Sequence, residues 1–172
     1  MEGRLTVETM VISHTSRKRF VERLRQLFGG TPPRVQAAAL PWRTGEKGVE
    51  VMLVTSGGAG RWVLPKGWPE NDEPLSTTAA REAAEEAGVT GSVAPREIGR
   101  FYYGKQLPSG LEWRCEVHVF PLEVDHVADK WPERKKRMRA WFSPAEAIAR
   151  VQEPDLGELI GAFADNPRKI AA

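Results

Sequence analysis

Three glutamates lie within five consecutive residues of the chain, at positions 82, 85 and 86. Residues three and four apart are neighbours on a helix, so this spacing predicts three carboxylates crowded within one turn. Glu82 and Glu86 would repel each other by roughly 0.2–0.5 kcal/mol in an exposed helix. A divalent cation would offset that repulsion, because hard carboxylate oxygens suit Mg²⁺ and Mn²⁺.

The same glutamates could instead form a solvated acidic face. Taken alone, the segment EAAEE favours that alternative, since such runs are common on surface helices. The surrounding residues change the balance, because further Gly, Glu, Arg and Val residues stand at fixed distances from the glutamates. The full pattern is G-x5-E-x7-R-E-x2-E-E-x-G-V, formed by Gly67, Glu73, Arg81, Glu82, Glu85, Glu86, Gly88 and Val89.

This pattern is the Nudix box, and the chain resembles the Nudix hydrolase family from roughly Arg34 to Val151. Ala83 departs mildly from the family, which usually has a bulky aliphatic residue there. The lead-in RWVLPKGW resembles the branch that hydrolyses diadenosine polyphosphates and diphosphoinositol polyphosphates. The resemblance implies an α/β fold, a Nudix-type α/β/α sandwich around a mixed β-sheet. It also implies metal-dependent hydrolysis of a phosphoanhydride bond in a substrate of that type.

The resemblance further implies roles for the box residues. Glu82, Glu86 and the backbone carbonyl of Lys66 would bind the metal, which would be Mg²⁺ or Mn²⁺. Glu85 and Arg81 would be the catalytic residues, with Glu85 as general base or ligand of a metal-bound water and Arg81 orienting a glutamate. Members differ in which glutamate is the base, so the division between Glu82 and Glu85 stays open.

Four residues are candidates for binding substrate. Arg34, Ser56 and Arg61 match phosphate-binding positions in diphosphoinositol polyphosphate phosphohydrolases, and the Lys66 side chain could reach a phosphate oxygen. Each of the first three has an equally weighted structural alternative: Arg34 starts a strand, Ser56 caps a turn, and Arg61 is a solvated edge residue. The expected partner is a phosphorylated small molecule.

Two other functions remain open. The basic cluster at residues 134–139 mildly favours hydrolysis of pyrophosphate from the 5′ end of RNA, although a solvated surface is the more usual explanation of such a cluster. A catalytically silent nucleotide-binding sensor on the same fold is the other alternative. Such proteins typically lack box glutamates, whereas Glu82, Glu85 and Glu86 are all present here.

The helix that carries the glutamates is predicted from Pro74 to Ala87, with Gly88 closing it. Four alanines recur at helical spacing, so we expect them to pack against a sheet, with the three glutamates on nearly the opposite side. These alanines are Ala80, Ala83, Ala84 and Ala87.

Apolar runs bounded by turn residues predict the other elements. Strands are predicted at 34–42, 49–55, 61–64, within 91–105 and at 112–124. Helices are predicted at 16–28, from Ser143-Pro144 to about Val151, and at 155–164. We expect residues 1–30 to form an N-terminal extension with a basic amphipathic helix, and residues 31–172 to form the Nudix domain. Packing of that helix on the domain is the expected arrangement, with a membrane surface as the alternative.

The length and composition of the chain make several other kinds of protein less expected. The 172 residues suffice for one domain with a short extension. The single cysteine, Cys115, excludes a disulfide within the chain and a cysteine-based zinc site. The net charge of +2 makes a nucleic-acid partner less expected. No segment is long and apolar enough to span a membrane and no secretory signal is recognised, so we expect a cytoplasmic protein.

Overall fold

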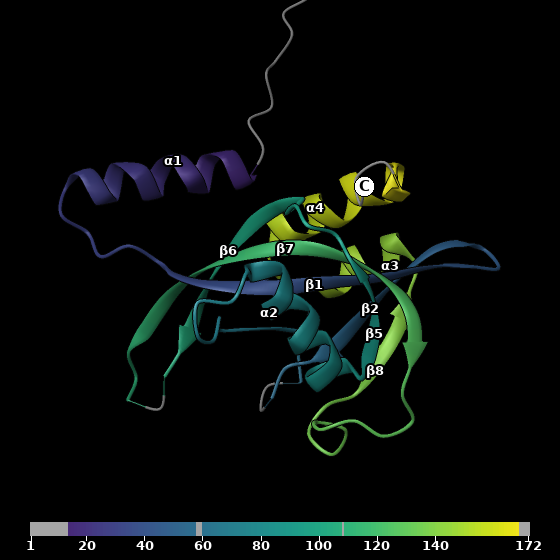
Figure 1. Cartoon of the computed structure of the whole chain (residues 1–172). Helices are drawn as coiled ribbons and strands as arrows, with labels where there is room; N and C mark the ends of the chain where they lie inside the picture. Colours follow the sequence, from purple (N-terminus) through teal and green to yellow (C-terminus); the bar gives the residue numbers. More distant parts are fainter. Residues whose placement is uncertain (1–13, 58–59, 108, 169–172) are drawn as a thin grey trace, which may run out of the picture.

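A mixed β-sheet forms the centre of the molecule in the computed structural model, which describes residues 14–57, 60–107 and 109–168 (Figure 1). Within those ranges the sheet has eight strands, with β3-β2-β1-β7-β5 as the main path. The pairing of β1 with β7 is parallel and the other pairs are antiparallel. The strands are β1 (Arg34–Gly45), β2 (Gly48–Thr55), β3 (Trp62–Val63), β4 (Lys66–Gly67), β5 (Val89–Val93), β6 (Gly99–Gln106), β7 (Glu112–Val127) and β8 (Arg139–Phe142).

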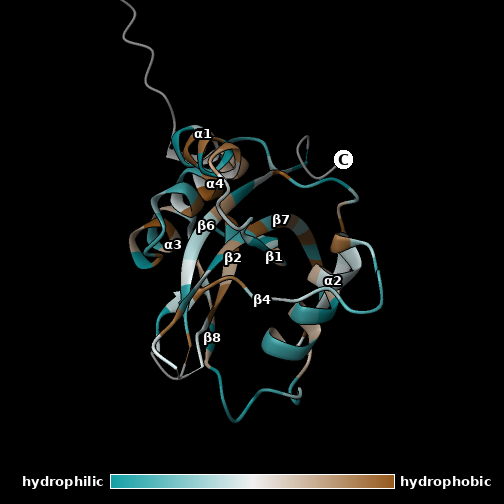
Figure 2. Cartoon of the chain, turned by 90° about the vertical axis from the view of Figure 1, so that its left-hand side faces the viewer, coloured by the Kyte–Doolittle hydropathy of each residue, from teal (hydrophilic) through white to brown (hydrophobic). Residues whose placement is uncertain are grey.

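Helices cover both faces of the sheet. Figure 2 shows α2 on one side and α3 and α4 on the other, which confirms the expected α/β/α sandwich. None of the helices in the described ranges is long and apolar enough to cross a lipid bilayer. The helices are α1 (His14–Leu27), α2 (Leu75–Glu82), a π-helical turn (Ala83–Ala87) that continues α2, α3 (Pro144–Arg150) and α4 (Pro154–Asp165).

Strand β1 contributes to two separate cores, because alternate side chains of a strand point to opposite faces. Ala37 and Ala39 face α2, and their small size lets that helix lie close to the sheet. Leu40 and Trp42 face α3 and α4, where Trp42 meets Phe163 edge-on with ring centroids 5.6 Å apart. The small-residue face of the sheet thus lies under the glutamate-bearing helix.

The alanines that pack on the sheet partly match the prediction: Ala80, Ala83 and Ala87 pack there as expected, whereas Ala79 is found in place of Ala84. Ala79, Ala83 and Ala87 are fully buried, whereas Ala80 and Ala84 are partly exposed. The buried set recurs every four residues because the last turn widens into a π-helix. The expectation that the glutamates lie opposite the alanines is wrong for Glu82 and Glu86, which are buried beside them.

Most of the other predicted elements are present. The cap of α3 is as expected: Ser143 Oγ accepts a hydrogen bond from Glu146 N (3.4 Å), and Glu146 Oε2 accepts one from Ser143 N (3.0 Å). The region 91–105 contains parts of β5 and β6, which are separate strands. Strand β8 was not predicted, because its four residues are too few to show a clear alternation.

Helix α1 lies against α4 and β6 of the domain, which is the predicted arrangement, but its apolar side does not face them. It contacts the domain through polar side chains, with an ion pair between Glu22 and Arg114 and another between Lys18 and Asp155 (3.0 Å). Leu27 and Phe28 are 80% and 87% exposed. The ion pairs orient the helix, and the apolar side is left facing solvent. Residues 1–13 of the predicted extension lie outside the described residues.

Asp155 joins three elements at one fully buried carboxylate. Its Oδ2 accepts a hydrogen bond from Tyr102 N on β6 (2.9 Å), and its Oδ1 accepts one from Lys18 Nζ on α1 (3.0 Å). It also lies in the first turn of α4, where the helix dipole favours negative charge.

We expect Asp155→Ala to lower the free energy of unfolding by about 2–3 kcal/mol, because Tyr102 N–H loses its charged acceptor. Urea denaturation measures this change. Asp165→Ala, at the exposed end of the same helix, is the matched control and should change the unfolding free energy little. Equal effects of the two substitutions would contradict the anchoring role of Asp155.

Candidate active site

The backbone of β4 lies directly against the glutamate helix. A Cβ on residue 67 would stand 1.9 Å from Oε1 of Glu82, so a side chain there would displace that carboxylate. One residue earlier, Lys66 N donates a hydrogen bond to Oε2 of Glu86 (3.1 Å). The two carboxylates, four residues apart on the helix, therefore both abut the Lys66–Gly67 backbone.

Arg81 holds one side of this arrangement. Its guanidinium donates to Glu73 Oε1 (2.9 Å), to Glu82 Oε1 (2.9 Å) and to the carbonyl of Trp68 (2.9 Å). The hydrogen bond from Arg81 to Glu73, helped by one from Thr78, holds the pKa of Glu73 below its ordinary value. Glu85 lies further out, 3.7 Å from Arg81, with a side chain that is 47% exposed. Arg81 thus fixes the loop before α2 and the orientation of Glu82 together.

Arg137 holds the other side and comes from the segment before β8. It forms an ion pair with Oε1 of Glu86. The same guanidinium donates to the carbonyl of Thr55 (2.9 Å) and to Glu133 Oε2 (2.5 Å). Each buried glutamate therefore has one arginine partner, Arg81 for Glu82 and Arg137 for Glu86.

Side chains from the segment before β8 and from β8 itself also bind the carbonyls at the end of the glutamate-bearing helix. Trp131 Nε1 donates to the carbonyl of Glu86 (3.1 Å), and Arg139 donates to that of Ala87 (2.5 Å). Gly88 ends the helix in the left-handed region with φ 62°. The explanation of residues 134–139 as a solvated face is therefore wrong for Arg137 and Arg139, which take part in structural contacts.

Burial sets the charge state of these groups. It raises the pKa of Glu86 from 4.5 to about 7, although Arg137 and Lys66 oppose the shift. It also raises the pKa of Glu82, with Arg81 opposing. Burial lowers the pKa of the Lys66 ammonium, against the opposing effect of Glu86 and Glu153. Two carboxylates with raised pKa values in one place create a site that favours added positive charge.

The donor set fits a hard divalent cation of the kind expected. Glu82 and Glu86 supply two buried carboxylates beside a backbone segment. In the part of the chain that the structure describes, no three acidic, histidine or cysteine side chains converge as a metal-binding group. A cation bound by this pair would therefore take its other ligands from backbone oxygens, water or substrate, as Mg²⁺ commonly does.

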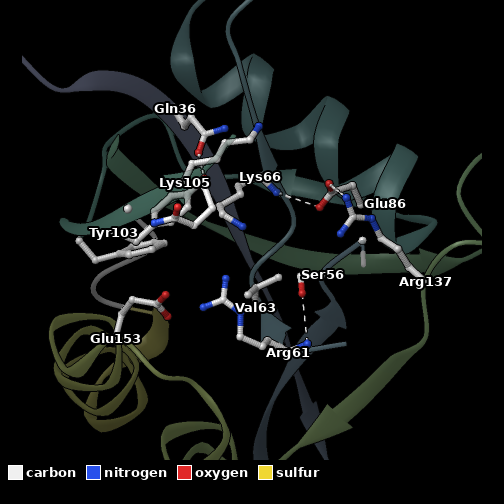
Figure 3. A pocket seen from close by; sticks show the side chains of 14 residues that line it. Gln36, Ser56, Arg61, Val63, Lys66, Glu86, Tyr103, Lys105, Arg137 and Glu153 are labelled. Atoms are coloured by element: carbon white, nitrogen blue, oxygen red, sulfur yellow. Dashed lines mark hydrogen bonds and ion pairs between the residues drawn. The ribbon is translucent and has the colours of Figure 1, made fainter. Parts of the chain in front are cut away.

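A cavity of about 350 Å³ opens next to Glu86 (Figure 3). Its cationic lining residues come from four separate segments, and Glu153 at the start of α4 points toward Arg61 across it. Tyr103 and Gln36 close another side through a hydrogen bond of 2.7 Å from Tyr103 Oη to Gln36 Oε1. The cationic residues are Arg61, Lys66, Lys105 and Arg137.

The predicted substrate-binding residues divide into two groups. Ser56, Arg61 and Lys66 all line the cavity. Ser56 also closes the turn between β2 and β3, because its Oγ accepts a hydrogen bond from Arg61 N (3.1 Å), so its structural alternative holds as well. Arg34 is not among the lining residues, and its guanidinium stacks on the ring of Trp113, 3.4 Å from the centroid.

Sequence reasoning did not single out several lining residues. Gln36 carried a usable signal, since it is a polar residue inside the apolar run of β1. Glu153 carried no signal, because its place at the cavity depends on how α4 packs against the sheet.

We expect the raised pKa of Glu86 to give a pH-dependent stability in chelator. Between pH 4.5 and about 7 the folded protein binds more protons at this carboxyl than the unfolded chain does, so the free energy of unfolding falls as pH rises through this range. Glu86→Gln removes the titration. Urea denaturation measures the difference in unfolding free energy between the parent protein and the variant at each pH. This difference should change by a few kcal/mol between pH 4.5 and about 7 and stay constant at higher pH. A difference independent of pH would contradict the burial of the charge.

Comparison with curated proteins finds plant relatives. Nudix hydrolase 21, chloroplastic, of Arabidopsis thaliana is 34% identical over 140 residues, which cover 81% of this chain and 66% of that protein. Nudix hydrolase 12, mitochondrial, of the same plant is 36% identical over 104 residues, covering 58% of this chain and 51% of that protein. The chain thus spans about half to two-thirds of the length of these relatives.

Solved structures share the fold. The C. elegans Ap4A hydrolase has a TM-score of 0.57 at 20% identity, covering 77% of this chain and 97% of that one. The NUDIX domain of Shewanella oneidensis NrtR, complexed with ADP ribose, has a TM-score of 0.58 at 15% identity, covering 82% and 97%. The family model of the NUDIX domain matches residues 32–162. Because this match covers most of the sequence, the chain belongs to the Nudix family.

Proposed function

We propose that this protein hydrolyses a phosphoanhydride bond in a diadenosine polyphosphate or diphosphoinositol polyphosphate type substrate, with Mg²⁺ or Mn²⁺ as cofactor. The observation that carries the proposal is the buried pair Glu82 and Glu86, which lies against the Lys66–Gly67 backbone beside a cavity lined by cationic side chains. The pair suits a divalent cation, and the cavity suits several phosphates.

The metal would be held by Glu82, Glu86 and the backbone carbonyl of Lys66. When bound, it supplies charge neutralisation at the phosphate oxygens and lowers the pKa of water. Arg137, which neutralises Glu86 in this structure, would then share that carboxylate with the cation. Its anchors at Glu133 and Thr55 would keep its guanidinium at the cavity.

The chain's own residues would perform the remaining steps. Glu85, the most exposed of the three helix glutamates, would accept a proton from the attacking water. Water would form a new P–O bond as the bridging P–O bond breaks, leaving two phosphorylated products. Arg81 would act by positioning Glu82 and Glu85, since its guanidinium contacts both. Arg61 and Lys66 would bind phosphate oxygens and Ser56 would add a hydroxyl, which together would hold the substrate in line for attack.

Arg34 stays a proposed substrate residue of a different kind. It lies outside the lining of the cavity and stacks on Trp113, so it would contact only a substrate that extends beyond the cavity. Substrates with a second nucleoside or several further phosphates have that length. The role of Arg34 is therefore tied to the size of the substrate.

Two other functions are less well supported. The basic cluster at residues 134–139 supports hydrolysis at the 5′ end of RNA less strongly than expected, because Arg137 and Arg139 bind groups within the protein. The fold is also that of the NrtR domain complexed with ADP ribose, which keeps a catalytically silent nucleotide sensor as the second candidate. A sensor would bind ligand in the same cavity without turnover.

The organisation of the chain belongs to the same proposal. We propose an N-terminal extension at residues 1–30 and the Nudix domain at residues 31–172, with the family match beginning at residue 32. The cytoplasm is the proposed compartment.

A product assay across a substrate panel tests the proposal, with Mg²⁺, with Mn²⁺ and with chelator. The panel holds diadenosine polyphosphates, a diphosphoinositol polyphosphate, nucleoside triphosphates and 5′-triphosphorylated RNA. We expect metal-dependent cleavage of one of the first two classes. Glu86→Gln should lower turnover by orders of magnitude, because a metal-binding carboxylate becomes an amide, whereas the exposed Glu123→Gln should not. Ligand binding without cleavage by folded protein would establish the sensor instead.

We expect Lys66→Ala and Arg61→Gln each to raise KM about tenfold or more, because each removes a charged hydrogen bond to phosphate. Arg43→Gln is the control, since Arg43 pairs with Glu50 on the β1–β2 hairpin away from the cavity. Steady-state kinetics on the substrate found above provide the measurement. Unchanged KM in both cavity variants would confine Lys66 to its backbone role. Arg34→Gln, tested on short and long substrates, should affect only the long ones.

A further inference from the structure

Helix α1 exposes an apolar stripe that nothing in the described part of the chain covers. Four large side chains of the helix, and a fifth on the residue directly after it, recur at spacings of three and four residues, so they share one side. Their exposed fractions range from 40% to 87%, whereas the core side chains of the domain are almost fully buried. We call these five the apolar stripe: Phe20, Val21, Leu24, Leu27 and Phe28.

The stripe is exposed because the opposite, polar side of α1 binds the domain. Lys18 Nζ lies 3.0 Å from Asp155 Oδ1 and donates a hydrogen bond to the carbonyl of Tyr102 (3.1 Å). Four residues later, Glu22 pairs with Arg114 on β7. An ordinary surface helix of a globular protein buries its apolar side and exposes its polar side. This helix does the reverse, so its orientation is suited to an external apolar partner.

The stripe is bordered by positive charge. Arg17, Arg23 and Arg25 are exposed; by helical spacing Arg23 and Arg25 flank the stripe, and Arg17 stands in line with it at its N-terminal end. Glu22, the only acidic residue of α1, is taken up by its pair with Arg114. An apolar stripe bordered by uncompensated arginines is the pattern of a helix that lies in the plane of a membrane surface.

We propose that α1 is a membrane-surface helix that docks this protein on a bilayer rich in anionic phospholipid. The stripe would enter the boundary between headgroups and acyl chains, while Arg17, Arg23 and Arg25 would meet the lipid phosphates. The domain would remain tethered to the helix by the Lys18 and Glu22 ion pairs.

A second copy of the chain fits this surface less well. Pairing two stripes would bring arginines of both helices together, and no acidic side chain of α1 is left to balance them. Like charges placed side by side oppose association. An anionic lipid surface matches both features of the helix, the apolar stripe and its positive border.

Cosedimentation of the full chain with vesicles tests the proposal. One set of vesicles contains phosphatidylcholine alone, and the other contains roughly one-third phosphatidylserine. We expect binding to the anionic vesicles, weaker binding at high salt because the lipid charge is screened, and little binding to phosphatidylcholine. Equal binding to both sets, or none to either, would overturn the proposal.

Variants separate the two contributions. Leu27→Ser with Phe28→Ser should lower the partition coefficient by at least roughly tenfold, because apolar burial in the bilayer is lost. Arg23→Gln with Arg25→Gln should lower it roughly fivefold for each charge removed. The matched controls lie elsewhere on the surface: Leu111→Ser removes an apolar side chain that is 66% exposed, and Arg96→Gln removes an exposed charge.

All the substituted residues are exposed, so we expect each variant to remain folded, and thermal unfolding checks this. Both controls should bind vesicles like the parent protein. Sedimentation velocity without lipid detects the alternative occupant. A dimer that is lost in the Leu27 and Phe28 variant, together with no difference in vesicle binding, would show that a second copy covers the stripe and would overturn the proposal. None of these measurements depends on hydrolytic activity, so their outcome is independent of the proposed function.

Discussion

Two carboxylates buried against a backbone are the constraint on which the rest of the site depends. Glu82 and Glu86 lie beside the alanines that pack on the sheet, so they cannot move to water without disturbing that packing. Gly67 leaves the space that the Glu82 carboxylate occupies, and a side chain at residue 67 would displace that carboxylate. The cost of burying two like charges explains why positive groups surround them and why a divalent cation suits the place.

The arginines around this pair form two distinct supports. Arg81 is local in sequence and ties Glu82 to the loop that ends at Glu73. Arg137 is distant in sequence and ties Glu86 to the segment before β8. The first support orients the helix relative to its own loop, and the second closes the cavity from the far edge of the sheet. A ligand in the cavity would contact the second support directly.

Helix α1 is a separate part of the molecule. Its contacts with the domain include the ion pairs to Asp155 and Arg114 and the hydrogen bond from Lys18 to the Tyr102 carbonyl, and none of its described side chains lines the cavity beside Glu86. The apolar stripe and the cavity can therefore serve different partners. A membrane-docked helix would set where the protein works, while the Nudix site would set what it does.

The sequence by itself determined the local features of the site. The box spacing identified Gly67, Arg81 and the three helix glutamates, because one helix and its preceding loop fix their relative positions through local geometry. The end of the glutamate-bearing helix at Gly88 and the start of α3 at Ser143 also followed from local backbone chemistry. The mixed sheet with helices on both faces was expected from the resemblance to the family.

Only the tertiary structure decided which distant residues join the site. Arg137 reaches Glu86 across 51 residues of sequence, and Glu153 reaches the cavity through the packing of α4. Arg34 and Arg61 were equal candidates from sequence, yet only Arg61 lines the cavity. The periodicity of α1 identified its apolar side but not the direction in which that side faces. These outcomes depend on strand register and long-range ion pairs, which no local pattern specifies.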